Sequence, residues 1–125
     1  MGDFLFAKAV GELVRLGDME PLRVFTQASS EMTVGELRQL ASFDALAFSE
    51  DDYHKLIRAK TASLVGAACE MGALAGAPRF RAQMRTFGES IGMAFQVADD
   101  LLDYTEQESV TGKPSGNDLK EHKVT

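Results

Sequence analysis

Apolar side chains recur along most of this chain at the spacing of amphipathic helices, three and four residues apart. In the segment 3–16 these positions are Leu5, Phe6, Ala9, Val10, Leu13 and Val14. No stretch shows the two-residue alternation that is typical of a half-buried strand. Ala, Leu, Met, Glu and Arg are common and β-branched residues are scattered, which also favours helix. The pattern therefore predicts an all-α protein.

Four helices and an irregular tail are expected, and particular residues mark where the helices end. The helices are predicted at residues 3–16, 19–42, 50–76 and 79–106. Gly17 ends the first helix, and Pro21 suits the first turn of the second. Gly35 is expected to loosen the second helix midway. Pro78 ends the third helix and separates it from the fourth. From Glu108 onward, Ser, Thr, Gly, Pro and Asn predict a C-terminal loop.

The third helix has the clearest start signal. Ser49 can cap its N-terminus, and Asp52 stands three residues later, which is a variant of the capping box. Glu50 and Asp51 lie in the first turn, where the helix dipole favours negative charge. Capping therefore explains this acidic cluster without a metal. The later half of the helix is rich in Gly and Ala, which permits close packing against another helix.

The overall composition limits the class of protein. With 125 residues, 45% of them apolar and 26% charged, the chain is one globular domain or a part of one. Its net charge of -6, without a basic stripe, argues against nucleic-acid binding. No apolar run is long enough to span a bilayer, and the N-terminus lacks the basic start of a signal peptide. The single cysteine, Cys69, leaves no internal disulfide. These features favour the cytoplasm.

Three aspartates on the fourth predicted helix form the most specific chemical feature of the chain. Asp99 and Asp103 are four residues apart, and Asp100 and Asp103 are three apart, so their side chains are neighbours on a helix. Each such like-charge pair costs roughly 0.2–0.5 kcal/mol of helix stability when no cation lies between the carboxylates. Carboxylates are hard oxygen ligands that suit Mg²⁺. Spacing alone leaves two interpretations open, a magnesium site and a solvated acidic helix face.

Cations that could accompany such a site occur at two places. Lys60 and Thr61 lie within the third predicted helix, flanked by small residues. Lys113 and Lys123 lie in the loop that follows the aspartates. Lys113 follows a glycine, and glycine-rich backbone can approach a phosphate closely. In isolation each position also fits a simpler interpretation, a lysine that snorkels at a helix edge or a solvated basic tail.

Taken together, these segments resemble the C-terminal part of the all-trans polyprenyl diphosphate synthases. The segment 92–104 resembles the second aspartate-rich motif of that family, and 112–125 resembles the loop that follows the motif. The segments 2–9, 35–40 and 60–61 also match, in the right order. The resemblance covers essentially the whole chain, and the joint match is specific.

The resemblance implies a fold, a reaction and a set of site residues. The fold is a fragment of the helical bundle of isoprenoid synthases, with residues 1–125 as a partial domain. The reaction condenses isopentenyl diphosphate with an allylic diphosphate in the presence of Mg²⁺. The implied metal ligands are Asp99, Asp100 and Asp103, the implied substrate-binding residues are Lys60, Gln96, Lys113 and Lys123, and the implied catalytic residues are Lys60, Thr61 and Gln96.

The chain also departs from the family pattern. It lacks the first aspartate-rich motif, the arginine-rich segment and the last helices, so we expect a fragment that does not catalyse prenyl transfer alone. His122 stands just before Lys123, where the family usually has glycine. Because glycine tolerates backbone angles that histidine does not, we expect the conformation of this loop to differ.

The resemblance further implies medium or long products for quinone side chains and a homodimer formed through the first two helices. One alternative is a non-catalytic homologue or partner subunit that keeps the fold and the dimer surface. A weaker alternative is a terpene cyclase-type domain.

Overall fold

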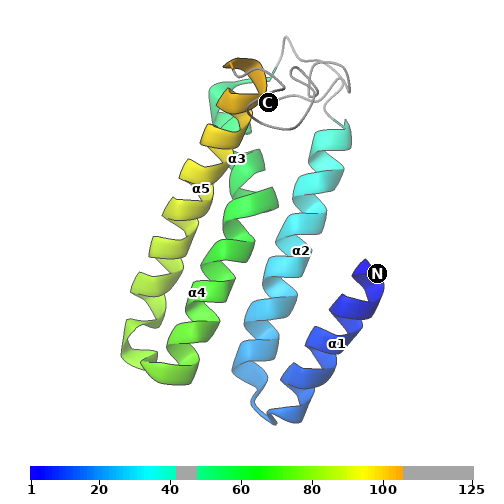
Figure 1. Ribbon diagram of the computed structural model, residues 1–125, viewed down its shortest axis with the longest axis vertical. Coiled ribbons are helices and arrows are strands. Elements are labelled where there is room, and N and C mark those ends of the chain that lie inside the picture. The colour runs from blue at the N-terminus through cyan, green and yellow to red at the C-terminus, as the bar shows by residue number, and fades with distance from the viewer. Residues whose placement is uncertain (42–47, 106–125) are drawn as a thin grey trace.

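A computed structural model describes residues 1–41 and 48–105, and over these residues the chain is helical, without a strand (Figure 1). The elements are α1 (Gly2–Arg15), α2 (Met19–Ala41), α3 (Glu50–Ile57), the π-helix η2 (Arg58–Ala62), α4 (Ser63–Gly76), the 3₁₀ turn η3 (Pro78–Phe80) and α5 (Arg81–Thr105). The predicted all-α class is confirmed. Within the described ranges, no helix is both long and apolar enough to cross a membrane.

The ends of the helices lie close to the predicted boundaries, and for the predicted reasons. Gly17 follows α1 with a φ of 69°, a left-handed conformation that glycine adopts without strain. At the start of α3, the Ser49 hydroxyl accepts a hydrogen bond from the Asp52 backbone N–H at 3.1 Å. The Asp52 carboxylate in turn accepts from the Ser49 backbone N–H at 3.3 Å, which completes the capping box. Pro78 opens η3 after the end of α4.

The third predicted helix is not one continuous α-helix, which corrects the sequence-based boundary. A five-residue π-helix, η2, separates α3 from α4. Glycines of the neighbouring helices approach this wide turn: a Cβ on Gly35 of α2 would lie 3.0 Å from the Ala59 Cβ, and one on Gly92 of α5 would lie 2.6 Å from the Ala62 Cα. Gly35 therefore allows close packing and does not interrupt α2. Single π turns within helices often occur at functional sites.

Helices α4 and α5 lie side by side and pack through small residues (Figure 1). A Cβ on Gly88 would lie 2.7 Å from the Val65 carbonyl oxygen and 2.8 Å from the Gly66 Cα, so the two backbones nearly touch. This confirms the expected close packing of the Gly- and Ala-rich helix. The buried apolar cluster on the other side of α4 joins Val24 and Ala28 of α2 to Ala67.

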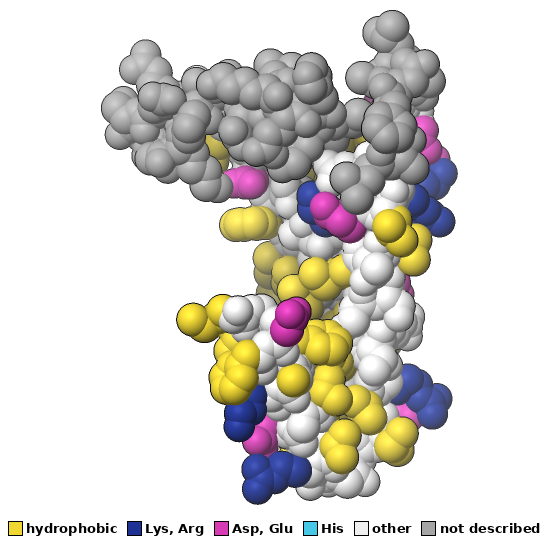
Figure 2. All heavy atoms as spheres, turned by 90° about the vertical axis from the view of Figure 1, so that its right-hand side faces the viewer, with side chains coloured by type: hydrophobic (Ala, Val, Ile, Leu, Met, Phe, Trp, Pro, Cys, Tyr) yellow, Lys and Arg dark blue, Asp and Glu magenta, His cyan; other side chains and the backbone are white. Residues whose placement is uncertain are grey.

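Large apolar side chains remain exposed on two faces. Hydrophobic side chains gather on the face over α1 and α2 (Figure 2). The exposed members on these helices are Phe4, Leu5, Phe6, Val14, Met19, Val34 and Leu37. On α5, Phe87, Ile91 and Phe95 are exposed at a four-residue spacing, which makes a stripe along one side of the helix. Apolar faces of this kind commonly mark surfaces that contact other protein segments.

Candidate functional site

A chain of hydrogen bonds joins η2, α5 and α3 at the level of the predicted site. The Thr61 hydroxyl donates to the Gln96 side-chain oxygen at 2.6 Å. The Gln96 amide nitrogen donates to Oδ1 of Asp100 at 2.8 Å. The hydroxyl of Tyr53, which lies on α3, donates to Oδ2 of the same carboxylate at 2.6 Å. Three of the residues selected from the sequence are thus brought into direct contact.

The carboxylate of Asp100 determines the donor and the acceptor in each of these three hydrogen bonds. An ionised carboxylate only accepts hydrogen bonds, so the NH₂ end of Gln96 must face Asp100 and its oxygen must face Thr61. The Thr61 hydroxyl is therefore the donor to Gln96. Burial of Tyr53, together with its hydrogen bond to Asp100, raises the tyrosine pKa well above its usual range, so Tyr53 remains a donor at neutral pH.

The three aspartates are not equivalent. Asp100 is buried, with 9% of its surface exposed, and both of its oxygens accept a hydrogen bond. Asp99 is exposed and Asp103 is half-buried on the same helix. Among residues 1–41 and 48–105, no group of three or more potential ligands is arranged to hold a metal ion. Carboxylate oxygens are nevertheless suitable donors for Mg²⁺, which proteins usually hold with one or two carboxylates plus substrate phosphates.

Lys60 adjoins Thr61 in η2 but extends toward α2. Its Nζ donates to the Gln39 side-chain oxygen at 2.7 Å and lies 3.4 Å from an oxygen of Glu36. The lysine is half-buried, and Glu36 partly neutralises it. Lys60 is therefore positioned by the C-terminal part of α2, and the Thr61 network is positioned by α5. The other two predicted cations, Lys113 and Lys123, lie outside the described residues, as does His122.

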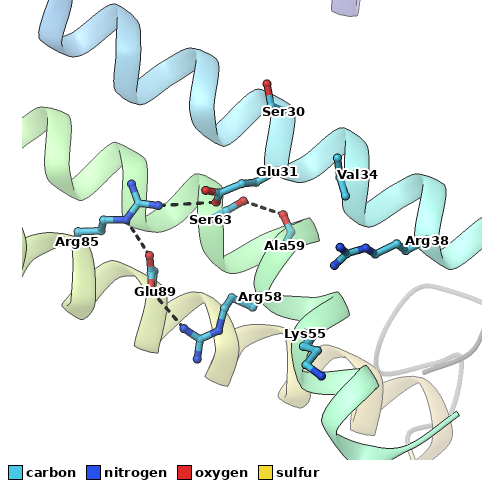
Figure 3. Close-up of a pocket in the computed structure, with 10 residues that line it drawn as sticks. All are labelled: Ser30, Glu31, Val34, Arg38, Lys55, Arg58, Ala59, Ser63, Arg85 and Glu89. Atoms are coloured by element: carbon cyan, nitrogen blue, oxygen red, sulfur yellow. Dashed lines mark hydrogen bonds and ion pairs between the residues drawn. The ribbon is translucent and has the colours of Figure 1, made fainter.

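Two cavities differ in their relation to these residues. A cavity of about 380 Å³ between α3 and α5 is bordered by Tyr53 and Asp100 and otherwise lined by Phe48, Ser49, Glu50, Val97 and Leu101. A larger pocket of about 520 Å³ is shown in Figure 3 and contains none of the predicted site residues. Its charged side chains are largely paired with one another: Glu89 binds Arg85 at 2.9 Å and Arg58 at 3.6 Å. The smaller cavity is the one that adjoins the site.

Two residues that make buried polar contacts, Tyr53 and Glu70, were not predicted from the sequence. Tyr53 was not selected, although it lies eight residues before Thr61, about two helical turns away. Glu70, with 5% of its surface exposed, was also missed, and its carboxylate binds Arg81 at 2.6 Å and Arg85 at 2.8 Å. A lone glutamate within the otherwise apolar segment 63–76 was the available signal for this buried network.

Comparisons with known proteins show the family to which this chain belongs. The polyprenyl synthetase family model matches residues 1–125. Component 2 of the heptaprenyl diphosphate synthase of Geobacillus stearothermophilus is 39% identical, over 99% of this chain and 39% of its own length. The octaprenyl diphosphate synthase of Escherichia coli is 36% identical, over 100% of this chain and 39% of its own length. The chain thus spans about two fifths of these relatives.

Solved structures show the same fold. The polyprenyl synthase of Caulobacter crescentus, crystallised with calcium and isoprenyl diphosphate, has a TM-score of 0.89 and 41% identity, and the match covers 99% of this chain and 38% of that one. The decaprenyl diphosphate synthase of Rhodobacter capsulatus has a TM-score of 0.86 and 38% identity, with 99% and 39% covered. The chain is therefore a member of the polyprenyl synthetase family and has part of its isoprenoid synthase fold.

Proposed function

We propose that this chain carries the side of an all-trans prenyltransferase site that binds the allylic diphosphate. The reaction condenses isopentenyl diphosphate with that allylic diphosphate. The observation that supports the proposal most is the direct hydrogen-bonded connection of Thr61, Gln96 and Asp100. Lys60 precedes Thr61 in the sequence and extends toward α2. Thr61 lies in η2, and Gln96 and Asp100 lie in α5. These two elements pack closely because Gly92 has no side chain.

The residues have separate roles in this proposal. Lys60, together with Lys113 and Lys123, binds the diphosphate oxygens through charge-assisted hydrogen bonds. Asp99, Asp100 and Asp103 would hold Mg²⁺ through their carboxylates, and the ion would supply positive charge that stabilises the leaving diphosphate. The calcium and isoprenyl diphosphate bound to the Caulobacter relative support this chemistry.

Thr61 and Gln96 act after the carbon–oxygen bond of the allylic diphosphate breaks. The bonding electrons leave with the diphosphate, the double bond of isopentenyl diphosphate attacks the remaining allylic carbocation, and the resulting cation loses a proton to form the new double bond. The backbone carbonyl oxygen of Thr61 and the side-chain oxygen of Gln96 are electron-rich groups that stabilise the positive charge. The orientation of the Gln96 amide, with its oxygen toward Thr61, suits this role.

The assembled enzyme needs more than this chain provides. The chain spans about two fifths of the length of its relatives. We propose that prenyl transfer also requires a segment equivalent to the remaining three fifths.

The exposed apolar face of α1 and α2 supports a homodimer (Figure 2). The chain-length names of the relatives support medium or long products. We also propose a cytoplasmic location. The alternative is a non-catalytic partner subunit, and the Geobacillus relative is itself one component of a synthase.

Calorimetric titration of the chain with Mg²⁺ and inorganic pyrophosphate tests the site. We expect binding that requires both partners and weakens about tenfold or more in Lys60→Gln. Lys8→Gln is the matched control, because Lys8 is an exposed lysine on α1, remote in sequence from the site. Absence of binding by the unsubstituted chain, or equal weakening by both substitutions, would refute the proposal. Steady turnover of isopentenyl diphosphate by the chain alone would refute its dependence on further segments.

A further inference from the structure

We propose that Tyr53 is a positioning residue that fixes the orientation of the Gln96 amide by holding the carboxylate of Asp100. The inference rests on the proposed function, because it assigns Tyr53 a role toward residues of that site. Tyr53 lies on α3 and is separated from Asp100 by 47 positions in the sequence, so the fold alone brings them together. Its hydroxyl donates to Oδ2 of Asp100 at 2.6 Å, which is short for a hydrogen bond between two oxygens.

The first step concerns the rotation of the Asp100 carboxylate. The terminal torsion of an aspartate is soft, so the backbone does not determine where its two oxygens point. In this structure each oxygen has its own donor, the Tyr53 hydroxyl on Oδ2 and the Gln96 amide nitrogen on Oδ1. The two donors come from different helices, α3 and α5. Removal of the tyrosine hydroxyl leaves one donor, and the carboxylate is then free to turn.

The second step concerns the amide of Gln96. A threonine hydroxyl can donate or accept, so Thr61 by itself would tolerate either end of the Gln96 amide. The ionised carboxylate of Asp100 tolerates only the NH₂ end. Asp100 therefore decides which end of the amide faces Thr61, and Tyr53 keeps Asp100 in the place from which it does so.

The third step concerns the surroundings of the carboxylate. Asp100 is buried beside a cavity of about 380 Å³ whose lining includes the apolar side chains of Phe48, Val97 and Leu101. The oxygens of a buried carboxylate beside apolar groups each require a hydrogen-bond donor. Tyr53, on the border of the same cavity, supplies one of the two observed.

The chemical consequence follows from which atom Gln96 presents near Thr61. An oxygen in that position stabilises positive charge, whereas an NH₂ group repels it. Tyr53 touches neither substrate nor metal in this proposal and acts only through Asp100. Groups that orient ligands from behind in this manner typically change metal affinity 10- to 100-fold when they are removed.

The test uses the full chain labelled with ¹⁵N, in which the side-chain NH₂ signals of Gln96 are assigned by their loss in Gln96→Leu. We expect Tyr53→Phe to shift or broaden these signals. Asp100→Asn should shift the same signals by an independent route, which keeps the test informative if Tyr53→Phe folds poorly. Asp51→Asn is the control: it removes an exposed ion pair with Lys55 on the same helix, α3, lines neither cavity, and should leave the Gln96 signals unchanged. Unchanged signals in Tyr53→Phe, or equal shifts in Asp51→Asn, would overturn the proposal.

A second measurement is calorimetric titration with Mg²⁺ and inorganic pyrophosphate. Tyr53→Phe should bind about tenfold more weakly, and Asp51→Asn about as tightly as the unsubstituted chain. Equal affinity of Tyr53→Phe and the unsubstituted chain would overturn the positioning role. If the unsubstituted chain does not bind Mg²⁺ and pyrophosphate, the proposed function fails, and the Gln96 signals alone then decide whether Tyr53 orients the amide.

Discussion

Arg85 of α5 donates to the buried carboxylate of Glu70 of α4 at 2.8 Å, between two helices whose backbones pack closely at Gly88. Arg81, one turn earlier on α5, binds the other carboxylate oxygen at 2.6 Å and also contacts Glu20 of α2 at 2.7 Å. Burial by itself raises the pKa of Glu70, but the hydrogen bonds from Arg85 and Arg81 outweigh it and hold the pKa below its usual value. This network joins α2, α4 and α5. Along α5 it lies about three helical turns before Gln96 of the proposed site.

The lowered pKa of Glu70 predicts how stability depends on pH. The carboxyl has its ordinary pKa of 4.5 in the unfolded chain and a lower one in the folded chain, so the unfolded chain binds more protons between the two values. The contribution of Glu70 is therefore fully present above about pH 4.5 and is lost as the pH falls through the folded value. Denaturant unfolding between pH 3 and 7 should show this loss in the unsubstituted chain and a smaller one in Glu70→Gln. Equal slopes would contradict it.

Glu70→Gln should also weaken the fold at neutral pH. The substitution leaves two arginines beside a neutral amide, and breaking a buried pair in this way typically costs 3–5 kcal/mol. Both guanidinium groups are partly exposed to water, so we expect a smaller loss, about 2 kcal/mol in the free energy of unfolding. Glu12→Gln, which removes an exposed pair with Arg15, should change the free energy by less than about 0.5 kcal/mol. Similar losses in both variants would argue against the special role of Glu70.

Gly92→Ala should destabilise the chain because a Cβ there would lie 2.6 Å from the Ala62 Cα of η2. Overpacking of this kind typically costs about 1–3 kcal/mol, which exceeds the helix propensity gained by replacing glycine. Gly72→Ala is the matched control within α4, since a Cβ at Gly72 meets nothing within 4 Å. It should stabilise the chain by up to about 1 kcal/mol. Urea unfolding checks both, and a stabilised Gly92→Ala would contradict the glycine contact.

The sequence predicted the fold class and the helix ends because both depend on local chemistry. The capping box of Ser49 and Asp52, the left-handed Gly17 and the break at Pro78 each involve residues close together in the chain. The π turn was missed because nothing in residues 58–62 marks it. The glycines that lie against it, Gly35 and Gly92, belong to two other helices, so the contact is not visible locally in the sequence.

The site was predicted only in part for a similar reason. Thr61, Gln96 and Asp100 were selected from the resemblance, and the structure brings them together. Tyr53 was missed because its contact with Asp100 spans 47 positions, and no neighbouring residue in the sequence marks that contact. The sequence also did not indicate which of the three aspartates is buried, because the burial of one helix face depends on the elements packed against it, and of the three only Asp100 is buried.

The Thr61 hydroxyl allows a test of the network with two substitutions at a single position. Thr61→Val keeps the shape of the side chain but leaves the Gln96 oxygen without its donor at 2.6 Å. An unsatisfied polar group at a partly buried position typically costs about 1–3 kcal/mol, so we expect a loss of about 1 kcal/mol in the free energy of unfolding. Thr61→Ser keeps the hydroxyl and loses only a methyl group. In urea unfolding and in the titration with Mg²⁺ and pyrophosphate, the serine variant should therefore lie closer to the unsubstituted chain than the valine variant does. A serine variant as impaired as the valine variant would mean that the methyl group, and not the hydrogen bond to Gln96, is what this position requires.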